Sequence, residues 1–243
     1  MPKTKGSSMG GEREFDDVAE GAFTYAGDGK EQIEFFKNHS NVEDIINGMS
    51  FDDKDAIDSW AGGHMMYGQQ YKGWDKMNNY DKKLTEIYDD VLDKSVLSHG
   101  VVVARLSDGQ LLFGSGKEDG TIDEYRAMEG RTIISKGHMS TGVAKQGLAI
   151  GHRVKPVEYK IHIPSGAKGA GMWIGDGRIN GWGERQREFM VNRDTAFRVG
   201  RTSYDFDRGV YVVHLHYTGR MKHDYGTSGR LPKNSLDYYN RNS

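Results

Sequence analysis

Residues 157–163 read VEYKIHI, a stretch in which every second residue is apolar. This period of two is typical of a β-strand with one buried and one exposed face. Further short strands are expected on both sides of it, at 99–106, 110–113, 131–135, 188–191, 196–199 and 210–217, with glycine-rich loops between them. The second half of the chain is therefore predicted to consist mainly of strands.

The first half of the chain has the spacing of helices. Ser50 and Asp53 form the S-x-x-D pattern that caps a helix start, and the adjacent Gly62 and Gly63 would end that helix. Further on, the apolar residues at 84, 87, 88, 91 and 92 fall on one face of a second helix. Helices followed by strands favour an α+β fold, in which helices pack on mostly antiparallel sheets, over alternating βαβ units.

The chain of 243 residues has the length of one compact domain with short appendages. Residues 1–20 lack hydrophobic periodicity and are expected to form a flexible lead. We expect one domain over 21–220, with a helical part at 31–97 and a strand-rich part at 98–220. The remainder, 221–243, is rich in polar residues without a period and is expected to be a flexible tail.

The charge balance excludes some classes of partner. With 33 basic and 35 acidic residues the net charge is −2, so the bulk charge does not indicate a nucleic-acid-binding protein. Residues 11–60 hold 14 acidic and 4 basic side chains, so the rest of the chain is net positive and suited to an anionic ligand. A solvated acidic face explains the same asymmetry without any ligand.

Cysteine is absent, which excludes disulfides, thiolate metal sites and cysteine nucleophiles. No apolar run reaches the roughly 20 residues of a membrane span, and residues 1–11 lack the apolar core of a signal peptide. We therefore expect a soluble protein that does not act at a membrane. Its location stays open between an intracellular protein, a virion-carried protein and a delivered effector.

Several familiar motifs fail on spacing. The glycines of residues 175–181, GDGRING, do not have the spacing of a dinucleotide fingerprint, and Gly116-Lys117 precedes a glutamate rather than the hydroxyl of a P-loop. His214 and His216 share one face of a predicted strand and could ligate a metal ion, but a third ligand is not evident. We therefore expect no metal.

Three other segments belong together: VVVAR at 101–105, GHMSTG at 137–142 and WGERQREFMV at 182–191. In this order they resemble the arginine, serine and glutamate signature of the ADP-ribosyltransferase exoenzymes of the bacterial toxin type. The segments at 159–166 and 188–199 are also similar to that family, and the resemblance extends over about 45–217. Gly142 departs from the family's Ser-Thr-Ser strand, and Leu106 stands where the family often has glycine.

The resemblance implies a core of two mostly antiparallel β-sheets with N-terminal helices packed on it. It also implies a mono-ADP-ribosyltransferase that uses NAD as co-substrate. Glu188 would be the catalytic carboxylate and Ser140 would orient it, while Arg105, with Ser140 and Thr141, would bind NAD. These residue types suit the reaction, because loss of nicotinamide creates an oxocarbenium-like ribose that a carboxylate stabilises, and a guanidinium binds phosphate oxygens in a bidentate manner.

The resemblance assigns four further residues. Trp60 and Tyr67 would line the nicotinamide side of the site. Gln186, two residues before Glu188, would position the acceptor as a catalytic-site residue, and Trp182 would contact it. In the family a glutamine at this position goes with modification of asparagine, and an amide can both donate to and accept from another amide.

The expected partner besides NAD is therefore a macromolecular acceptor, a protein rather than a nucleic acid, modified on a side chain such as that of asparagine. Two alternatives stay open. In the first, water is the acceptor and the enzyme is an NAD glycohydrolase. In the second, the fold is a non-catalytic binding or assembly module, for example a component of a phage particle.

Overall fold

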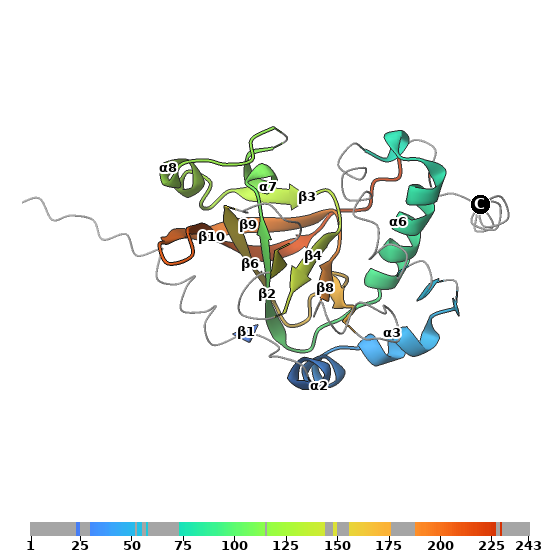
Figure 1. Cartoon of the computed structure of the whole chain (residues 1–243). Coiled ribbons are helices and arrows are strands. Elements are labelled where there is room, and N and C mark those ends of the chain that lie inside the picture. The colour runs from blue at the N-terminus through green and yellow to red at the C-terminus, as the bar shows by residue number, and fades with distance from the viewer. Residues whose placement is uncertain are drawn as a thin grey trace, which may run out of the picture.

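The structure is a computed structural model that describes residues 23–24, 30–51, 53–54, 57, 73–114, 116–143, 148–149, 156–175, 188–226 and 229. Its strands form a central sheet (Figure 1). Helices α2 (Lys30–His39) and α3 (Val42–Gly48) lie at one end of this sheet, and α6 (Asn79–Leu92) stands beside it. The predicted lead at 1–20 lies outside the described residues.

Helix α6 begins at a cap that its own sequence supplies. It follows the single 3-10 turn η1 (Trp74–Lys76), and the Asn78 side chain accepts a 2.8 Å hydrogen bond from the backbone N–H of Asp81. The five apolar residues predicted to share one face of this helix are all buried. The predicted capping box is also confirmed, since Ser50 and Asp53 each accept a hydrogen bond from the other's backbone N–H.

The strands follow one continuous hydrogen-bonded path. Its order is β3-β9-β10-β6-β2-β4-β8-β7, and β1 and β5 also pair with β2. The strands are β1 (Phe23–Thr24), β2 (Gly100–Ser107), β3 (Thr132–Ser135), β4 (Met139–Gly142), β5 (Leu148–Ala149), β6 (Val157–Ile163), β7 (Gly171–Trp173), β8 (Glu188–Val191), β9 (Thr195–Asp205) and β10 (Val210–Arg220).

The mixed α and β composition expected from the sequence is confirmed, and most strand pairs are antiparallel. Three pairs are parallel: β10 with β6, β1 with β2, and β2 with β5. The division into two sheets is not confirmed, because the described strands form one path. Within that path, Ala104 of β2 and Gly142 of β4 are the only residue pair that joins these two strands among the described residues.

The strand at 157–163 is correctly predicted in position, but its expected exposure is wrong, because all seven residues of β6 are buried. The cause is its place in the middle of the sheet, between β2 and β10. Its polar residues have partners there: Glu158 pairs with Lys160 and Arg208, and His162 Nε2 lies 2.9 Å from His214 Nδ1.

Residues 110–113 were expected to form a strand, and this prediction is wrong. They form a single helical turn, α7 (Gln110–Phe113), that precedes the short helix α8 (Ile122–Arg126). The backbone N–H of Gln110 is bonded to the Asp108 carboxylate, and those of Leu112 and Phe113 to the Gly109 carbonyl. A four-residue apolar run fits either structure, and here local hydrogen bonds decide it.

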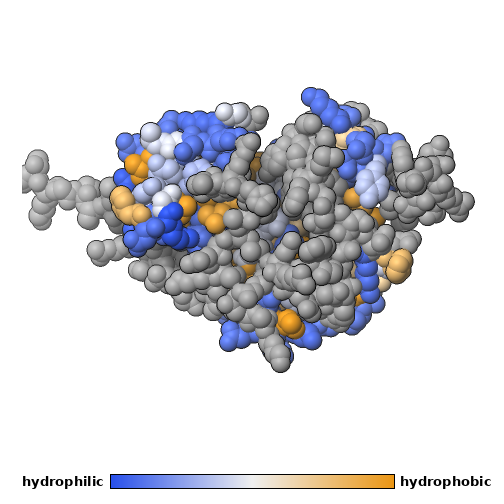
Figure 2. All heavy atoms as spheres, in the orientation of Figure 1, coloured by the Kyte–Doolittle hydropathy of each residue, from blue (hydrophilic) through white to orange (hydrophobic). Residues whose placement is uncertain are grey.

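Helix and strand residues share one hydrophobic core. Phe36 of α2 stacks on Trp173 of β7 with 5.4 Å between ring centroids, and it also contacts Phe189 of β8. On the face seen in Figure 2, the described hydrophobic residues form small separate patches among hydrophilic ones. The core therefore couples the N-terminal helices to the β7–β8 end of the sheet.

Residues 221–226, at the start of the predicted tail, contact the rest of the domain. Tyr225 Oη donates a 2.8 Å hydrogen bond to the Asp89 carboxylate of α6, and the Tyr225 ring packs edge-on against Trp74. The side chain of His223 is only 5% exposed. This part of the tail therefore packs along α6.

Candidate active site

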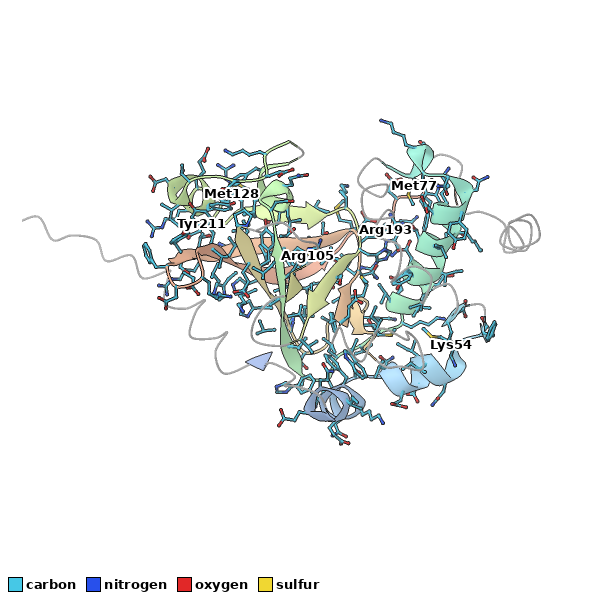
Figure 3. The ribbon with its side chains drawn as sticks, viewed as in Figure 1. Lys54, Met77, Arg105, Met128, Arg193 and Tyr211 are labelled. Carbon is cyan, nitrogen blue, oxygen red and sulfur yellow. The ribbon has the colours of Figure 1, made fainter. Side chains whose placement is uncertain are left out.

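Arg105 lies near the end of β2, in the middle of the sheet (Figure 3). Its guanidinium Nη1 donates a 3.0 Å hydrogen bond to the backbone carbonyl of Ser140 on β4. Arginine remains protonated at all physiological pH values, so this half-buried group is a permanent positive charge. The hydrogen bond directs that charge toward the strand that carries Ser140.

Strand β4 carries the two predicted hydroxyls, and all four of its residues are buried. Thr141 Oγ1 donates a 2.6 Å hydrogen bond to the backbone carbonyl of Phe189 on β8. Ser140 is paired with Met190 in the same ladder. The side chain of Thr141 therefore ties β4 to β8 in addition to the backbone hydrogen bonds.

Glu188 is the first residue of β8 and is 3% exposed. It pairs with Gly142 of β4, and Gly142 in turn pairs with Ala104 of β2. Directly paired residues project from the same face of a sheet, and so do residues two apart on one strand. Glu188 therefore shares its face with Ser140, and the position directly opposite it has no side chain.

The structure thus places Arg105, Ser140, Thr141 and Glu188 on three adjacent strands. Neighbouring strands are separated by roughly 4.8 Å, so the backbones of β2 and β8 lie on the order of 10 Å apart where β4 runs between them. The other predicted site residues, Trp60, Tyr67, Trp182 and Gln186, lie outside the described residues.

A buried carboxylate on α6 that the sequence reasoning missed lies at the other end of the β4–β8 pair. Asp89 is 0% exposed and accepts hydrogen bonds from Arg193 Nε at 3.0 Å and from Arg193 Nη2 at 2.8 Å. His138 Nε2 lies 3.2 Å from the same carboxylate, and Tyr225 donates to it. In Figure 3 Arg193 lies between the sheet and α6.

The protonation states in this cluster follow from burial and pairing. Burial alone would raise the pKa of Asp89, but the hydrogen bonds and charges of His138 and Arg193 hold that pKa well below its usual range. Burial lowers the pKa of His138, against the opposing pull of Asp89. Asp89 is therefore ionised, and His138 Nε2 lies beside its carboxylate.

The sequence carries only a weak signal for Asp89. Thr85, Asp89 and Leu92 follow the helical series i, i+4 and i+7, directly beside the apolar face of α6, and all three are buried. A charged residue at the margin of an apolar face is usually a solvated one. Its partners are distant along the chain, with Arg193 104 residues away, so periodicity could not reveal the pairing.

The histidine pair considered as a metal site has a third member. His162 of β6 lies against His214 and His216, with ring centroids 5.1 and 4.7 Å away. Within the part of the chain that the structure describes, no group of three or more histidine, aspartate or glutamate residues is arranged to hold a metal ion. Likewise, none of the described helices is long and apolar enough to span a membrane.

Comparisons with solved structures support this architecture. The chain superposes on C3stau2 from S. aureus, solved with NAD, with a TM-score of 0.61 at 17% identity, covering 82% of this chain and 99% of that one. For Plx2a, an ADP-ribosyltransferase toxin from Paenibacillus larvae, the TM-score is 0.62 at 17% identity, covering 79% of this chain and 96% of that one. For an ADP-ribosyltransferase from Clostridium botulinum, the TM-score is 0.63 at 14% identity, covering 80% of this chain and 98% of that one.

A comparison with curated protein sequences gives no match. A family model described as ADP-ribosyltransferase exoenzyme matches residues 38–216, which include β2, β4 and β8. This match spans most of the chain, and the fold agrees with it. The chain therefore belongs to the ADP-ribosyltransferase exoenzyme family and is an NAD-dependent ADP-ribosyltransferase.

Proposed function

We propose that residues 21–220 form a mono-ADP-ribosyltransferase domain that transfers ADP-ribose from NAD to a side chain of a target protein and releases nicotinamide. One observation carries this proposal: the register of β2, β4 and β8 brings Arg105, Ser140 and Glu188 onto adjacent strands. These are the residue types that the transfer needs, and they come from segments 35 and 48 residues apart in sequence.

Glu188 is proposed to carry the electrostatic part of catalysis. Departure of nicotinamide leaves positive charge on the ribose, and a carboxylate near that sugar stabilises the charge as it develops. A carboxylate that is 3% exposed acts more strongly than one in water, because little solvent screens it. Ser140, on the same face, would orient this carboxylate through its hydroxyl.

Arg105 is proposed to hold the phosphates of NAD. Its guanidinium binds phosphate oxygens with fixed geometry and does not lose its charge. The hydrogen bond from Arg105 to the Ser140 carbonyl links the phosphate site to the strand beside Glu188. Thr141, bonded to the Phe189 carbonyl, would keep that strand in place.

The residues proposed to bind the acceptor lie outside the described ranges. Gln186 is proposed to position the acceptor group, with Trp182 contacting the target protein. A glutamine at this position suits an amide acceptor such as asparagine, because both groups donate and accept hydrogen bonds. Trp60 and Tyr67 are proposed to line the nicotinamide side of the site.

The test uses the full chain with NAD labelled on the adenine and a cell lysate as the source of acceptor. We expect label on a protein band, free nicotinamide, and a decrease of about 10²–10³-fold in both for Glu188→Gln. The control is Glu158→Gln, a buried strand glutamate bonded to Arg208, assayed at a temperature at which both variants are folded.

The outcomes separate the alternatives. Equal nicotinamide release by wild type and Glu188→Gln would refute the role of Glu188. Complete loss of NAD without labelled protein would show a glycohydrolase. A folded protein that binds no NAD by calorimetry would show a non-catalytic module. Mass spectrometry of the labelled band would identify the modified residue and test the amide assignment.

A further inference from the structure

The strands that carry Ser140 and Glu188 are short. Strands β4 and β8 have four residues each, and β7 beyond them has three. Four residue pairs hold β4 to β8, from Met139 with Val191 to Gly142 with Glu188. Such a short ladder fixes the relative position of two side chains only if something else holds its ends.

One end of this ladder converges on Asp89. His138 immediately precedes β4 and contacts Asp89 at 3.2 Å, and Arg193, two residues after β8, forms the bidentate contact. Because β4 and β8 are antiparallel, the start of β4 and the end of β8 lie at the same end of the ladder. A single carboxylate on α6 therefore holds both strands at the end opposite Glu188.

The contacts of Asp89 with His138 and Arg193, called the Asp89 clamp below, are rigid for physical reasons. Asp89 is fully buried, and its two oxygens accept from a guanidinium fork whose geometry fixes both the distance and the orientation of Arg193. Asp194 adds a contact of 3.0 Å to Arg193 Nη1, and it has a positive φ of 55°, which tightens the turn into β9. The guanidinium also lies over the Tyr225 ring, 5.1 Å from its centroid.

We propose that Asp89 is a positioning residue, which sets the register and distance between Ser140 and Glu188 by clamping His138 and Arg193 to α6. The proposal rests on the proposed function of Glu188. Arg105 is on β2 and touches the clamped strand β4 at the Ser140 carbonyl, so we expect the clamp to act on the reaction at the ribose more than on the binding of NAD. The expected signature is a lower kcat with an almost unchanged KM for NAD.

The first test is Asp89→Asn, which keeps the shape but removes the charge. At a temperature at which circular dichroism shows it folded, we expect kcat for nicotinamide release to fall about tenfold or more, because small misplacements of reacting groups slow catalysis strongly. KM for NAD should stay within about threefold. Unchanged kcat in a folded Asp89→Asn would overturn the proposal.

A second pair of variants keeps the test decisive if Asp89→Asn does not fold. Arg193→Lys retains the charge but loses the fork, and we expect its kcat to fall about fivefold or more. Its matched control is Arg208→Lys, which changes the same residue type against another fully buried carboxylate, Glu158 of β6, a strand that pairs with neither β4 nor β8. That control should keep kcat within about twofold, and equal losses in both would overturn the proposal.

Rescue at His138 separates positioning from packing. His138→Gln keeps a polar side chain beside the Asp89 carboxylate, whereas His138→Leu removes it. We expect His138→Gln to retain at least about half of the wild-type kcat and His138→Leu to fall below about one tenth. Equal kcat in the two variants would contradict the clamp.

Failure of the proposed function is distinguishable. If the wild-type chain releases no nicotinamide, the clamp is measured by hydrogen exchange. Arg193→Lys should then speed exchange of the amides of β4 and β8 by about tenfold, with β9 and β10 unchanged. If Arg193→Lys changed the exchange rates of β9 and β10 as much as those of β4 and β8, the clamp would be overturned, whatever the activity of the chain.

Discussion

Strands β4, β8 and β7 are three or four residues long, whereas β9 and β10 are 11 residues each. Every residue of the three short strands is buried, but β9 and β10 alternate between buried and partly or fully exposed residues. The short-strand region, β4, β8 and β7, carries Ser140 and Glu188. The long-strand region, β6, β10 and β9, forms the other side of the sheet.

The two regions are stabilised in different ways. The long-strand region has long ladders, and nine residue pairs join β9 to β10. The short-strand region depends on contacts from outside the sheet, through the aromatic core against α2 and the Asp89 cluster on α6. A candidate active site is thus built where side chains, rather than backbone ladders, determine the geometry.

The largest expected effects come from a matched pair of core substitutions. Phe189 of β8 and Phe197 of β9 are both 0% exposed, so each change to alanine should lower the free energy of unfolding by about 3–5 kcal/mol. Nicotinamide release by the folded protein should fall only for Phe189→Ala, because Phe189 follows Glu188 and its ring packs against Phe36 of α2. Urea unfolding and an assay at low temperature measure the two quantities, and equal activity in both variants would remove the distinction between the regions.

The next effect is a difference in pH dependence. Burial, together with the nearby His214, His216 and Lys160, lowers the pKa of His162 to about 3. In the unfolded chain this histidine takes up a proton near pH 6.5, so as the pH falls from 6.5 toward 3 the unfolded state is favoured by up to about 1.4 kcal/mol per pH unit. The stability contributed by neutral His162 is therefore present above pH 6.5 and is lost in acid.

His223, packed against α6 and the turn between β8 and β9, should behave in the opposite way. Burial would lower its pKa, but the hydrogen bonds to Asp194 and Asp93 raise it above the usual value. The stability that protonated His223 contributes is thus fully present below pH 6.5 and is lost as the pH rises through its folded-state pKa. Urea unfolding at several pH values should give a higher free energy of unfolding for the wild type than for His162→Asn, and this difference should shrink in acid. The same difference between the wild type and His223→Asn should shrink in base. If the free energy of unfolding of both variants followed that of the wild type in parallel across pH, both assignments would be contradicted.

The smallest expected effect compares two threonines that bond to a neighbouring strand. Thr141 of β4 is 0% exposed and donates to the Phe189 carbonyl at 2.6 Å, whereas the exposed Thr218 of β10 donates to the Ala196 carbonyl at 3.1 Å. Thr141→Val should lower the free energy of unfolding by about 1–2 kcal/mol, because a buried carbonyl loses its partner. Thr218→Val should change it by less than about 0.5 kcal/mol, since water replaces the hydroxyl. A larger effect at Thr218 would mean that the long-strand region also relies on side-chain bonds.

Much of this comparison could be anticipated from the sequence. Alternation located β6, and the order of the arginine, serine and glutamate segments identified the residues that the register then placed on β2, β4 and β8. The burial of β6 could not be predicted, because it depends on which strands lie beside it. The Asp89 clamp could not be predicted either, since its partners meet only through the tertiary fold.

Among the residues that the structure describes, one pair, Ala104 with Gly142, joins β2 to β4, and this has a mechanical consequence. A sheet joined by one residue pair bends more easily there than along a full ladder, so the junction between β2 and β4 is expected to act as a hinge. Arg105 and Glu188 lie on strands on the two sides of this junction, so a ligand bound to both strands would span it. Occupancy of the site would then stiffen the domain as a whole, and heat resistance would rise with substrate concentration.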